Sequence, residues 1–267
     1  MTDQELFNQQ GYLILRGFFS EEEMRGLDAA LKNAKPRFPT TLSKGGLQFT
    51  EFVHFHSKPL QDFLSSPKVV DFLKPFIGDD FWLRKDQIVS KSPGGGEFPW
   101  HQDNGYNGLR EEYFQFWTAV TDMVPENGSL SLIPGTHKSG ILTHGLQGTH
   151  RTWKGDEKDA VPVKAYRGDV LFFSSMLLHR SGPNITDKNR VAYVAEYLSS
   201  KNYDPFVRPP FFQVAKNGRP APKFIRFYKG SLSLPNRIRY AVPEFKQRRW
   251  EMEQFLRKKA QLLLKKT

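Results

Sequence analysis

Cysteine is absent from the 267-residue sequence. The chain therefore cannot form disulfide bonds, iron–sulfur clusters or thiolate zinc sites, and no cysteine nucleophile is available. Long hydrophobic runs are missing as well, because the longest nearly apolar stretch, residues 170–178, contains two serines and is far too short to cross a bilayer. Residues 1–10 are polar and acidic and lack the segments of a secretory signal. We therefore expect a cytoplasmic protein with no transmembrane segment.

Basic residues are unevenly distributed along the chain. The formal net charge is +11, yet residues 1–200 contain 22 lysines and arginines against 24 aspartates and glutamates, whereas residues 201–267 contain 17 against 4. Such a basic block can attract phosphates, nucleic acid or an anionic membrane, although a solvated helix face is the more common explanation. Residues 243–266 have the apolar spacing of a helix that packs on the domain.

The first 80 residues carry mostly helical signals. Ser20 is followed by three glutamates, which is typical of a helix start, and the helix is expected to end before Pro36. A second helix is predicted for residues 67–76 and a short strand for residues 11–16.

From residue 81 onward, short β-branched and aromatic runs alternate with turn residues. The predicted strands are residues 81–90, 114–121, 129–133, 169–173, 175–179 and 190–198. Several short strands separated by turns are typical of an all-β sandwich or barrel. We expect a single domain, mainly β with flanking helices, that comprises a helical support (1–80), a β core (81–200) and a basic extension packed on the core (201–267).

The strongest chemical signal is the segment Trp100-His101-Gln102-Asp103. In extended backbone, residues i and i+2 point to the same side, so His101 and Asp103 can offer an imidazole nitrogen and a carboxylate oxygen to one ion. Two histidines and one carboxylate form the facial triad of non-haem Fe(II) oxygenases. The candidate for the second histidine is His179, which ends an apolar run.

This pattern also has a structural explanation. A His-x-Asp sequence alone occurs by chance and suits a surface turn, and a lone histidine after an apolar run is more often a core residue. Arg190 favours the site, because it lies eleven residues after His179 and can reach back across a hairpin to bind a carboxylate with two hydrogen bonds. A dicarboxylate that chelates iron at one end needs such a cation at the other.

The sequence resembles the phytanoyl-CoA dioxygenase-like enzymes of the Fe(II)/2-oxoglutarate oxygenase superfamily. The resemblance extends from residue 7 to about residue 197 and follows the family's order and spacing. The segments that carry it are FNQQGYLILRG (7–17), WHQD (100–103), WTA (117–119), NGSL (127–130), IPGTHK (133–138), GD (168–169) with FF (172–173), and HRSGPN (179–184) leading to Arg190.

The resemblance implies a double-stranded β-helix, the jelly-roll fold of cupin-like proteins, and it implies roles for individual residues. The implied iron ligands are His101, Asp103 and His179. The implied anchor for the distal carboxylate of 2-oxoglutarate is Arg190, assisted by Ser181. Gln102, Trp117 and Lys91 match positions that line the cosubstrate pocket. The implied cofactors are Fe(II), 2-oxoglutarate and O2, with ascorbate as a further candidate.

Asp103 bears on the reaction outcome. Related halogenases have glycine or alanine at the position that Asp103 matches, which frees a coordination site for chloride. The carboxylate therefore favours hydroxylation of an unactivated C–H bond, with release of succinate and CO2 from 2-oxoglutarate.

Substrate-facing residues are predicted from their place around the motif. The candidates are Tyr106, Arg180 and His56, with Phe98, Trp100 and Tyr113 as an aromatic wall. Arg180 stands where the family often has glycine, and it either contacts substrate or points outward. Residues 139–160, which include His144 and His150, are predicted to be a flexible lid or an exposed insertion.

We expect a small-molecule substrate, and the C-terminal charge suggests an anionic one. The basic residues that would cover the barrel mouth are Arg226, Lys229, Arg237 and Arg239. Two other functions fit the sequence: a catalytically idle cupin-like binding protein, and an oxygenase that acts on nucleic acid or a membrane glycolipid through the basic region. Nucleic acid is the less favoured partner, an acyl-CoA is not expected, and the sequence does not indicate an oligomeric state.

Overall fold

The computed structural model describes residues 1–37, 40–42, 46–147 and 150–241. The helix predicted for residues 243–266 lies outside this part of the chain. The helices are α1 (Asp3–Gln10), α2 (Glu21–Lys32), α3 (Lys58–Leu64), α4 (Pro67–Ile77), α5 (Asp103–Asn107) and α6 (Lys229–Leu232), with 3-10 turns η1 (Val53–His56) and η2 (Thr136–Ser139). None of the helices in the described ranges has both the length and the apolar character that a bilayer crossing requires.

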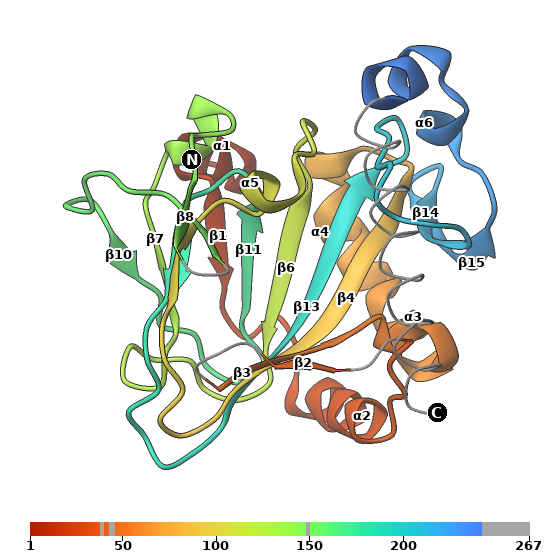
Figure 1. Cartoon of the computed structure of the whole chain (residues 1–267). Helices are drawn as coiled ribbons and strands as arrows, with labels where there is room; N and C mark the ends of the chain where they lie inside the picture. The colour runs from red at the N-terminus through yellow and green to blue at the C-terminus, as the bar shows by residue number, and fades with distance from the viewer. Residues whose placement is uncertain (38–39, 43–45, 148–149, 242–267) are drawn as a thin grey trace, which may run out of the picture.

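Two antiparallel sheets make up the body of the molecule (Figure 1). The large sheet has the order β1 (Tyr12–Leu15), β11 (Val170–Ser174), β6 (Phe114–Ala119), β13 (Arg190–Ser199), β4 (Phe81–Lys91), β14 (Phe211–Lys216) and β15 (Arg219–Ile225), and β3 (Leu47–Glu51) pairs with β4 and with β2 (Thr41–Leu42). The small sheet has the order β10 (Val161–Pro162), β7 (Leu130–Leu132), β12 (His179–Ser181) and β5 (Phe98–His101). A separate hairpin joins β8 (Gly145–Gln147) to β9 (His150–Thr152).

This arrangement is a double-stranded β-helix with flanking helices, so the predicted fold class is confirmed. The predicted strands at 81–90, 114–121 and 190–198 correspond to β4, β6 and β13. The helix after Ser20 also forms, because Ser20 Oγ accepts a hydrogen bond from Glu23 N while the Glu23 side chain accepts one from Ser20 N.

The prediction of a strand at residues 175–179 is wrong. Residues 175–178 form a turn, in which Leu177 N donates to Ser174 O and Met176 N donates to Ser174 Oγ. Serine hydroxyls stabilise such turns by hydrogen bonding to nearby backbone. The turn carries the chain from β11 of the large sheet to β12 of the small sheet, and the strand therefore starts at His179 instead of ending there.

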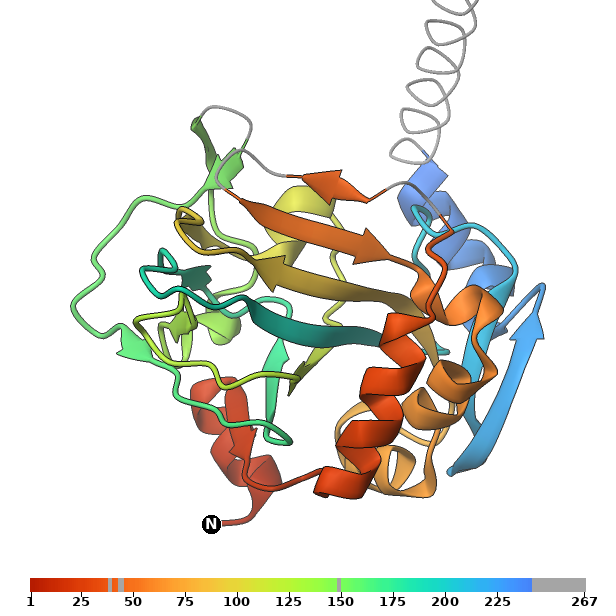
Figure 2. The ribbon, with the colours of Figure 1, turned by 90° about the horizontal axis from the view of Figure 1, so that it is seen from below.

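The hydrophobic core lies on both faces of the large sheet. Phe116 and Phe172 point outward and pack under helices α1 to α4, which cover that face in Figure 2. Trp117 and Phe173 are their neighbours in sequence and point inward, toward the small sheet. This alternation follows from the two-residue period of a strand, and it leaves the inward face free to build a site.

A stability prediction follows from Phe172, whose fully buried ring lies 4.9–5.5 Å from four other phenylalanine rings. Phe172→Ala should lower the free energy of unfolding by about 3–5 kcal/mol, because it removes buried apolar contacts and leaves a cavity. Urea unfolding followed by circular dichroism measures this. The control is Ile185→Ala, since Ile185 is 76% exposed and should contribute under about 0.5 kcal/mol. Equal losses for the two variants would contradict the assigned packing.

Candidate active site

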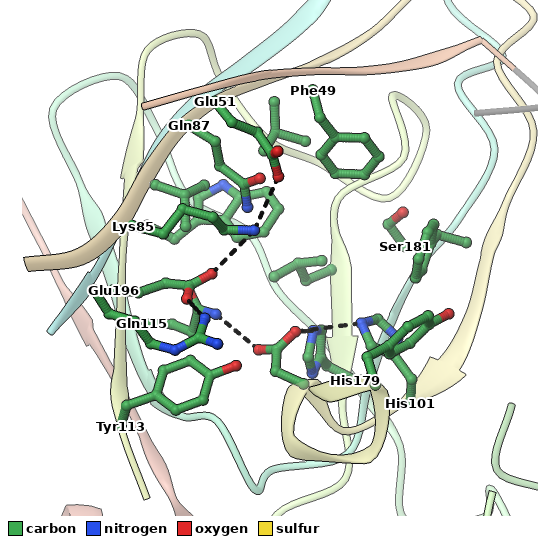
Figure 3. A pocket seen from close by; sticks show the side chains of 18 of the residues that line it. Phe49, Glu51, Lys85, Gln87, His101, Tyr113, Gln115, His179, Ser181 and Glu196 are labelled. Atoms are coloured by element: carbon green, nitrogen blue, oxygen red, sulfur yellow. Dashed lines mark hydrogen bonds and ion pairs between the residues drawn. The ribbon is translucent and has the colours of Figure 1, made fainter. Parts of the chain in front are cut away.

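A cavity of about 670 Å³ lies between the two sheets. Strands β3, β4, β6 and β13 line it from the large sheet, and strands β5, β7 and β12 line it from the small sheet. Its volume is in the range of small-molecule sites. Figure 3 shows the polar side chains that point into it.

His101, Asp103 and His179 meet at one end of this cavity. The pairing of β12 with β5 places His179 directly opposite His101. Gln102 has extended backbone angles (φ −109°, ψ 140°), so Asp103, the first residue of α5, points to the same side as His101. Asp103 Oδ1 lies 3.7 Å from His101 Nε2 and 3.9 Å from His179 Nε2, and one ligand atom from each residue fits within 4.8 Å of the others.

The hydrogen bonds around the three residues leave one ligand atom of each directed at the shared centre. His101 Nδ1 lies 2.8 Å from Pro99 O and His179 Nδ1 lies 3.0 Å from Leu177 O, so each Nδ1 carries the proton and each Nε2 is a free electron-pair donor. Asp103 Oδ2 accepts a hydrogen bond of 2.8 Å from Gln115 Nε2, which leaves Oδ1 for a ligand.

Electrostatics in the cluster also suit a cation. Burial, and then the neighbouring His179, hold the pKa of His101 well below its ordinary value, so the imidazole is neutral. Burial raises the pKa of the Asp103 carboxyl, because the charged form loses hydration. A divalent ion at this point would compensate for the lost hydration of the carboxylate and accept electron pairs from both imidazoles, and two histidines with one carboxylate are a common ligand set for non-haem iron.

A second group of residues forms a buried cationic corner of the cavity. Arg190 is 1% exposed, and its Nη2 donates to Gly128 O at 3.0 Å, while Nε and Nη1 have no hydrogen-bond partner among the described residues. Lys91 pairs with Arg190 across β4 and β13, and its Nζ donates to Ser181 Oγ at 2.9 Å. The Arg190 guanidinium lies over the ring of Trp117, 5.6 Å from its centroid.

The pKa values of the two cations reflect this burial. Burial lowers the pKa of Arg190 to about 10, and burial together with the charge of Arg190 lowers the pKa of Lys91 to about 7. Buried donors without partners are rare in folded proteins. The unpaired Nε and Nη1 of Arg190, with Lys91 beside them, therefore mark a place where an anion would be bound. Arg190, Ser181 and Trp117 line the cavity, and Lys91 lies behind Ser181.

Gln102 was expected to line the cosubstrate pocket, but it does not. Its side chain is fully buried and turns away from the cavity, where Nε2 donates to Gly140 O and Met176 O and Oε1 accepts from Leu142 N. Because Gln102 lies between His101 and Asp103 in an extended segment, its side chain must point to the opposite side. It fastens the loop after residue 139 to the strand that carries His101.

The predictions of substrate contact for Arg180 and His56 are also wrong. Arg180 points away from the cavity, where it forms an ion pair with Glu157 at 3.4 Å and lies over the ring of Trp100. Trp100 is on that same outer side, so it does not belong to the aromatic wall. His56 ends η1, is exposed and does not line the cavity. Its neighbour His54 is buried and bonded to Asp86.

Tyr106, Phe98 and Tyr113 do line the cavity. The ring of Tyr106 meets the ring of His101 edge to face, with centroids 5.3 Å apart. Most described residues of the segment predicted to be a lid or an exposed insertion (139–160) are exposed, and part of the segment packs against this region. His150 lines the cavity beside Phe98, and His144 Nε2 accepts a hydrogen bond of 3.0 Å from Gln102 N.

The cavity also holds a charged network that sequence reasoning missed, and its member Gln115 contacts Asp103. Its members are Glu51, Arg84, Lys85, Gln115 and Glu196. Dashed lines in Figure 3 join Lys85 to Glu51 and to Glu196. The available signal was charge inside strands: Arg84 and Lys85 interrupt the apolar start of β4, and Glu196 stands among apolar residues in β13. Buried charges are costly unless paired, so charges in a buried strand indicate a network or a site.

The basic residues expected to cover the mouth do not line the cavity. Arg226, Lys229, Arg237 and Arg239 are absent from its walls, and Arg239 instead pairs with Glu111 at 3.0 Å. These four residues, which lie in the described part of the chain, therefore give no support to an anionic substrate.

Comparison with known proteins gives matches along most of the chain. Residues 7–192 match the model of the phytanoyl-CoA dioxygenase (PhyH) family. A methylphosphonate hydroxylase from Gimesia maris is 32% identical over 202 residues, which cover 71% of this chain and 78% of that protein. Dioxygenase lolE1 from Epichloe uncinata is 29% identical over 225 residues, which cover 79% of this chain and 86% of that protein.

Among solved structures, the chain is similar to EvdO2 from Micromonospora carbonacea var. aurantiaca, crystallised in complex with 2-oxoglutarate. The TM-score is 0.62 and the identity is 25%, with 74% of this chain and 89% of that chain covered.

The hydrogen bond from Gln115 to Asp103 yields a prediction about metal affinity. Gln115→Leu should weaken Fe(II) and Co(II) binding about 10- to 100-fold, because the bond that orients the Asp103 carboxylate is lost. Calorimetric titration with Co(II) measures the affinity. Gln87→Leu is the matched control, since Gln87 lines the same cavity without contacting Asp103. Unchanged affinity in a folded Gln115→Leu variant would contradict the assigned role.

Proposed function

The chain belongs to the phytanoyl-CoA dioxygenase family, and from this premise we propose that it is an Fe(II)- and 2-oxoglutarate-dependent dioxygenase that hydroxylates an unactivated C–H bond of a small organic substrate. The reaction would consume O2 and release succinate and CO2. The observation that carries the proposal is the pair of unpaired N–H groups on buried Arg190, in the same cavity as the cluster of His101, Asp103 and His179.

Iron would be held by His101 Nε2, His179 Nε2 and Asp103 Oδ1. Three protein ligands on one face leave the remaining positions of the ion for 2-oxoglutarate and O2. Bound ferrous iron would supply the activation of O2 that accompanies decarboxylation of 2-oxoglutarate. Gln115 holds Asp103 Oδ2, so the carboxylate presents one oxygen in a fixed direction.

Arg190 would bind the distal carboxylate of 2-oxoglutarate. Its Nε and Nη1 have free N–H donors, and either one can act together with the second N–H of Nη2 to donate two parallel hydrogen bonds, which is the geometry that a carboxylate accepts from a guanidinium. Lys91 would add a second positive charge and also holds the Ser181 hydroxyl in place. Trp117 supports the guanidinium face, so the anchor is rigid before the cosubstrate arrives.

The size of the cavity, about 670 Å³, favours a small molecule over a polymer. Tyr106 and Phe98 stand beside His101 and would keep water from the reacting C–H bond. The basic C-terminal residues in the described part of the chain do not line this cavity, which also speaks against a nucleic acid or a glycolipid headgroup as the substrate. The relative from Gimesia maris, named as a hydroxylase, supports the proposed type of reaction.

Removal of the proposed anchor should abolish cosubstrate binding. Arg190→Met should raise the Kd for 2-oxoglutarate at least about 100-fold, because two charge-assisted hydrogen bonds in a buried site are lost. Calorimetry with the Co(II)-loaded protein measures this, and Co(II) affinity itself should stay within a few-fold. Arg180→Met is the control, since it removes the same charge outside the cavity. An unchanged Kd for Arg190→Met would exclude Arg190 as the anchor.

Succinate formation tests the function directly. The wild-type protein with Fe(II), 2-oxoglutarate and O2 should release succinate slowly without substrate, and His179→Ala should release none, because one of the three proposed ligands is missing. Arg180→Ala, one residue further and on the opposite side of β12, should retain activity within about threefold. A wild-type protein that binds 2-oxoglutarate yet never forms succinate would instead be the idle binding protein.

A further inference from the structure

We propose that the end of the cavity formed by β3 and β4 recognises a basic amine, so that the substrate is a small alkylammonium compound. This inference rests on the proposed function for its reaction and concerns only which molecules the site accepts. It is argued from charges, unpaired acceptors and aromatic surfaces around Glu51, Lys85 and Gln87, which Figure 3 shows close together. The pair of Glu196 and Lys85 is separated along β13 and β4 from the pair of Arg190 and Lys91.

When Asp204, which also pairs with Arg84, is counted with the charged network, acidic groups outnumber basic groups. Arg84 is held on two sides by buried carboxylates, because it pairs with Glu196 and its Nε lies 2.5 Å from Asp204 Oδ2. Lys85 pairs with Glu51 and Glu196. These five residues carry three negative and two positive charges, so one negative charge is left over. It falls on Glu51, whose side chain is 32% exposed and whose one ion pair within the described ranges is with Lys85.

The same carboxylates already bind one primary ammonium group. Lys85 Nζ lies 3.5 Å from Glu196 Oε1 and 3.1 Å from Glu51 Oε1. Although burial opposes the charge, Glu196 and Glu51 raise the pKa of Lys85 above its ordinary value. The environment therefore stabilises an alkylammonium ion, which is the group that a substrate amine would present beside it.

Two unpaired amide oxygens lie in this part of the cavity. Gln87 Oε1 and Gln115 Oε1 accept no hydrogen bond from the described residues, although both side chains are more than nine-tenths buried and line the cavity. Gln115 pairs with Glu196 across β6 and β13, and its Nε2 donates to Asp103, which fixes its amide with the oxygen left over. An unpaired acceptor is satisfied by a ligand that brings N–H donors, whereas carboxylate or phosphonate oxygens cannot donate to it.

Aromatic side chains complete the surroundings. Phe49 and Phe52, from β3 and the residue after it, line the cavity next to Glu51, and Phe98 packs against Phe49 edge to face. Alkylammonium groups are attracted both to carboxylates and to aromatic faces, and sites that bind them commonly combine the two. An anionic group placed here would instead face the surplus charge of Glu51.

The position of this network also orients the substrate. Gln115 connects Glu196 at the amine end to Asp103 in the proposed iron cluster. An amine held by Glu51 therefore directs the remaining carbon skeleton along the cavity toward His101 and His179. We expect oxidation at a carbon that is separated from the nitrogen.

Three probes of one shape test the proposal: cyclohexylamine, cyclohexanol and cyclohexanecarboxylate. Their affinities are measured by calorimetry on the protein loaded with Co(II) and 2-oxoglutarate at pH 7.5, where the amine is protonated. Cyclohexylamine should bind at least tenfold more tightly than cyclohexanecarboxylate. Glu51→Gln should weaken the amine at least fivefold and leave cyclohexanol unchanged. The control Glu126→Gln, an exposed glutamate outside the cavity, should change neither.

Equal or tighter binding of the carboxylate, or an amine affinity that survives Glu51→Gln, would overturn the proposal. Glu51 is partly exposed on β3, so the variant is expected to fold, and its melting temperature verifies this. Succinate release by the wild-type protein without any probe is measured in parallel. If succinate is released but the amine does not bind more tightly than the carboxylate, only the inference about the substrate is refuted. If no succinate is released, the proposed reaction is refuted, and the amine preference is judged from the binding data alone.

Discussion

The antiparallel pairing of β12 with β5 brings His179 opposite His101, and the chemistry of the cavity depends on this contact. The two histidines are 78 residues apart in the sequence, yet their ring centroids lie 4.1 Å apart. The turn after Ser174 makes the pairing possible, because it moves the chain from one sheet to the other immediately before His179. The convergence of His101, Asp103 and His179 therefore depends on sheet topology more than on any local motif.

Local sequence patterns predicted the fold class and most of the long strands, since alternating apolar residues and turn signals act over short range. They also located the three residues that meet in the cluster. The same alternation shows why Gln102, which the resemblance placed in the pocket, and Arg180, a substrate candidate, do not reach the cavity. Gln102 and Arg180 are sequence neighbours of inward-pointing residues in extended segments, so their side chains must point outward. For Arg180 this is the second of the two orientations that the sequence left open.

Other parts of the site depend on contacts between distant segments, which single-sequence patterns do not reveal. The charged network joins Glu51, Lys85 and Glu196 from three strands, and its members become neighbours only through the order of the large sheet. The total charge of a segment was a poor guide, because the basic C-terminal residues that the structure describes do not line the cavity. Individual charges within buried strands were the better signal of function.

The place of β3 at the margin of the large sheet has a consequence for how such enzymes diverge. Its pairing to the rest of the sheet is through β4 alone, apart from the short β2, yet it contributes Leu47, Phe49 and Glu51 to the cavity wall. The histidines, Asp103 and Arg190 lie on other elements. Mutations in β3 can thus alter which molecules the cavity accepts without changing the two histidines, Asp103 or Arg190. A single substitution in β3 can therefore change substrate specificity during evolution.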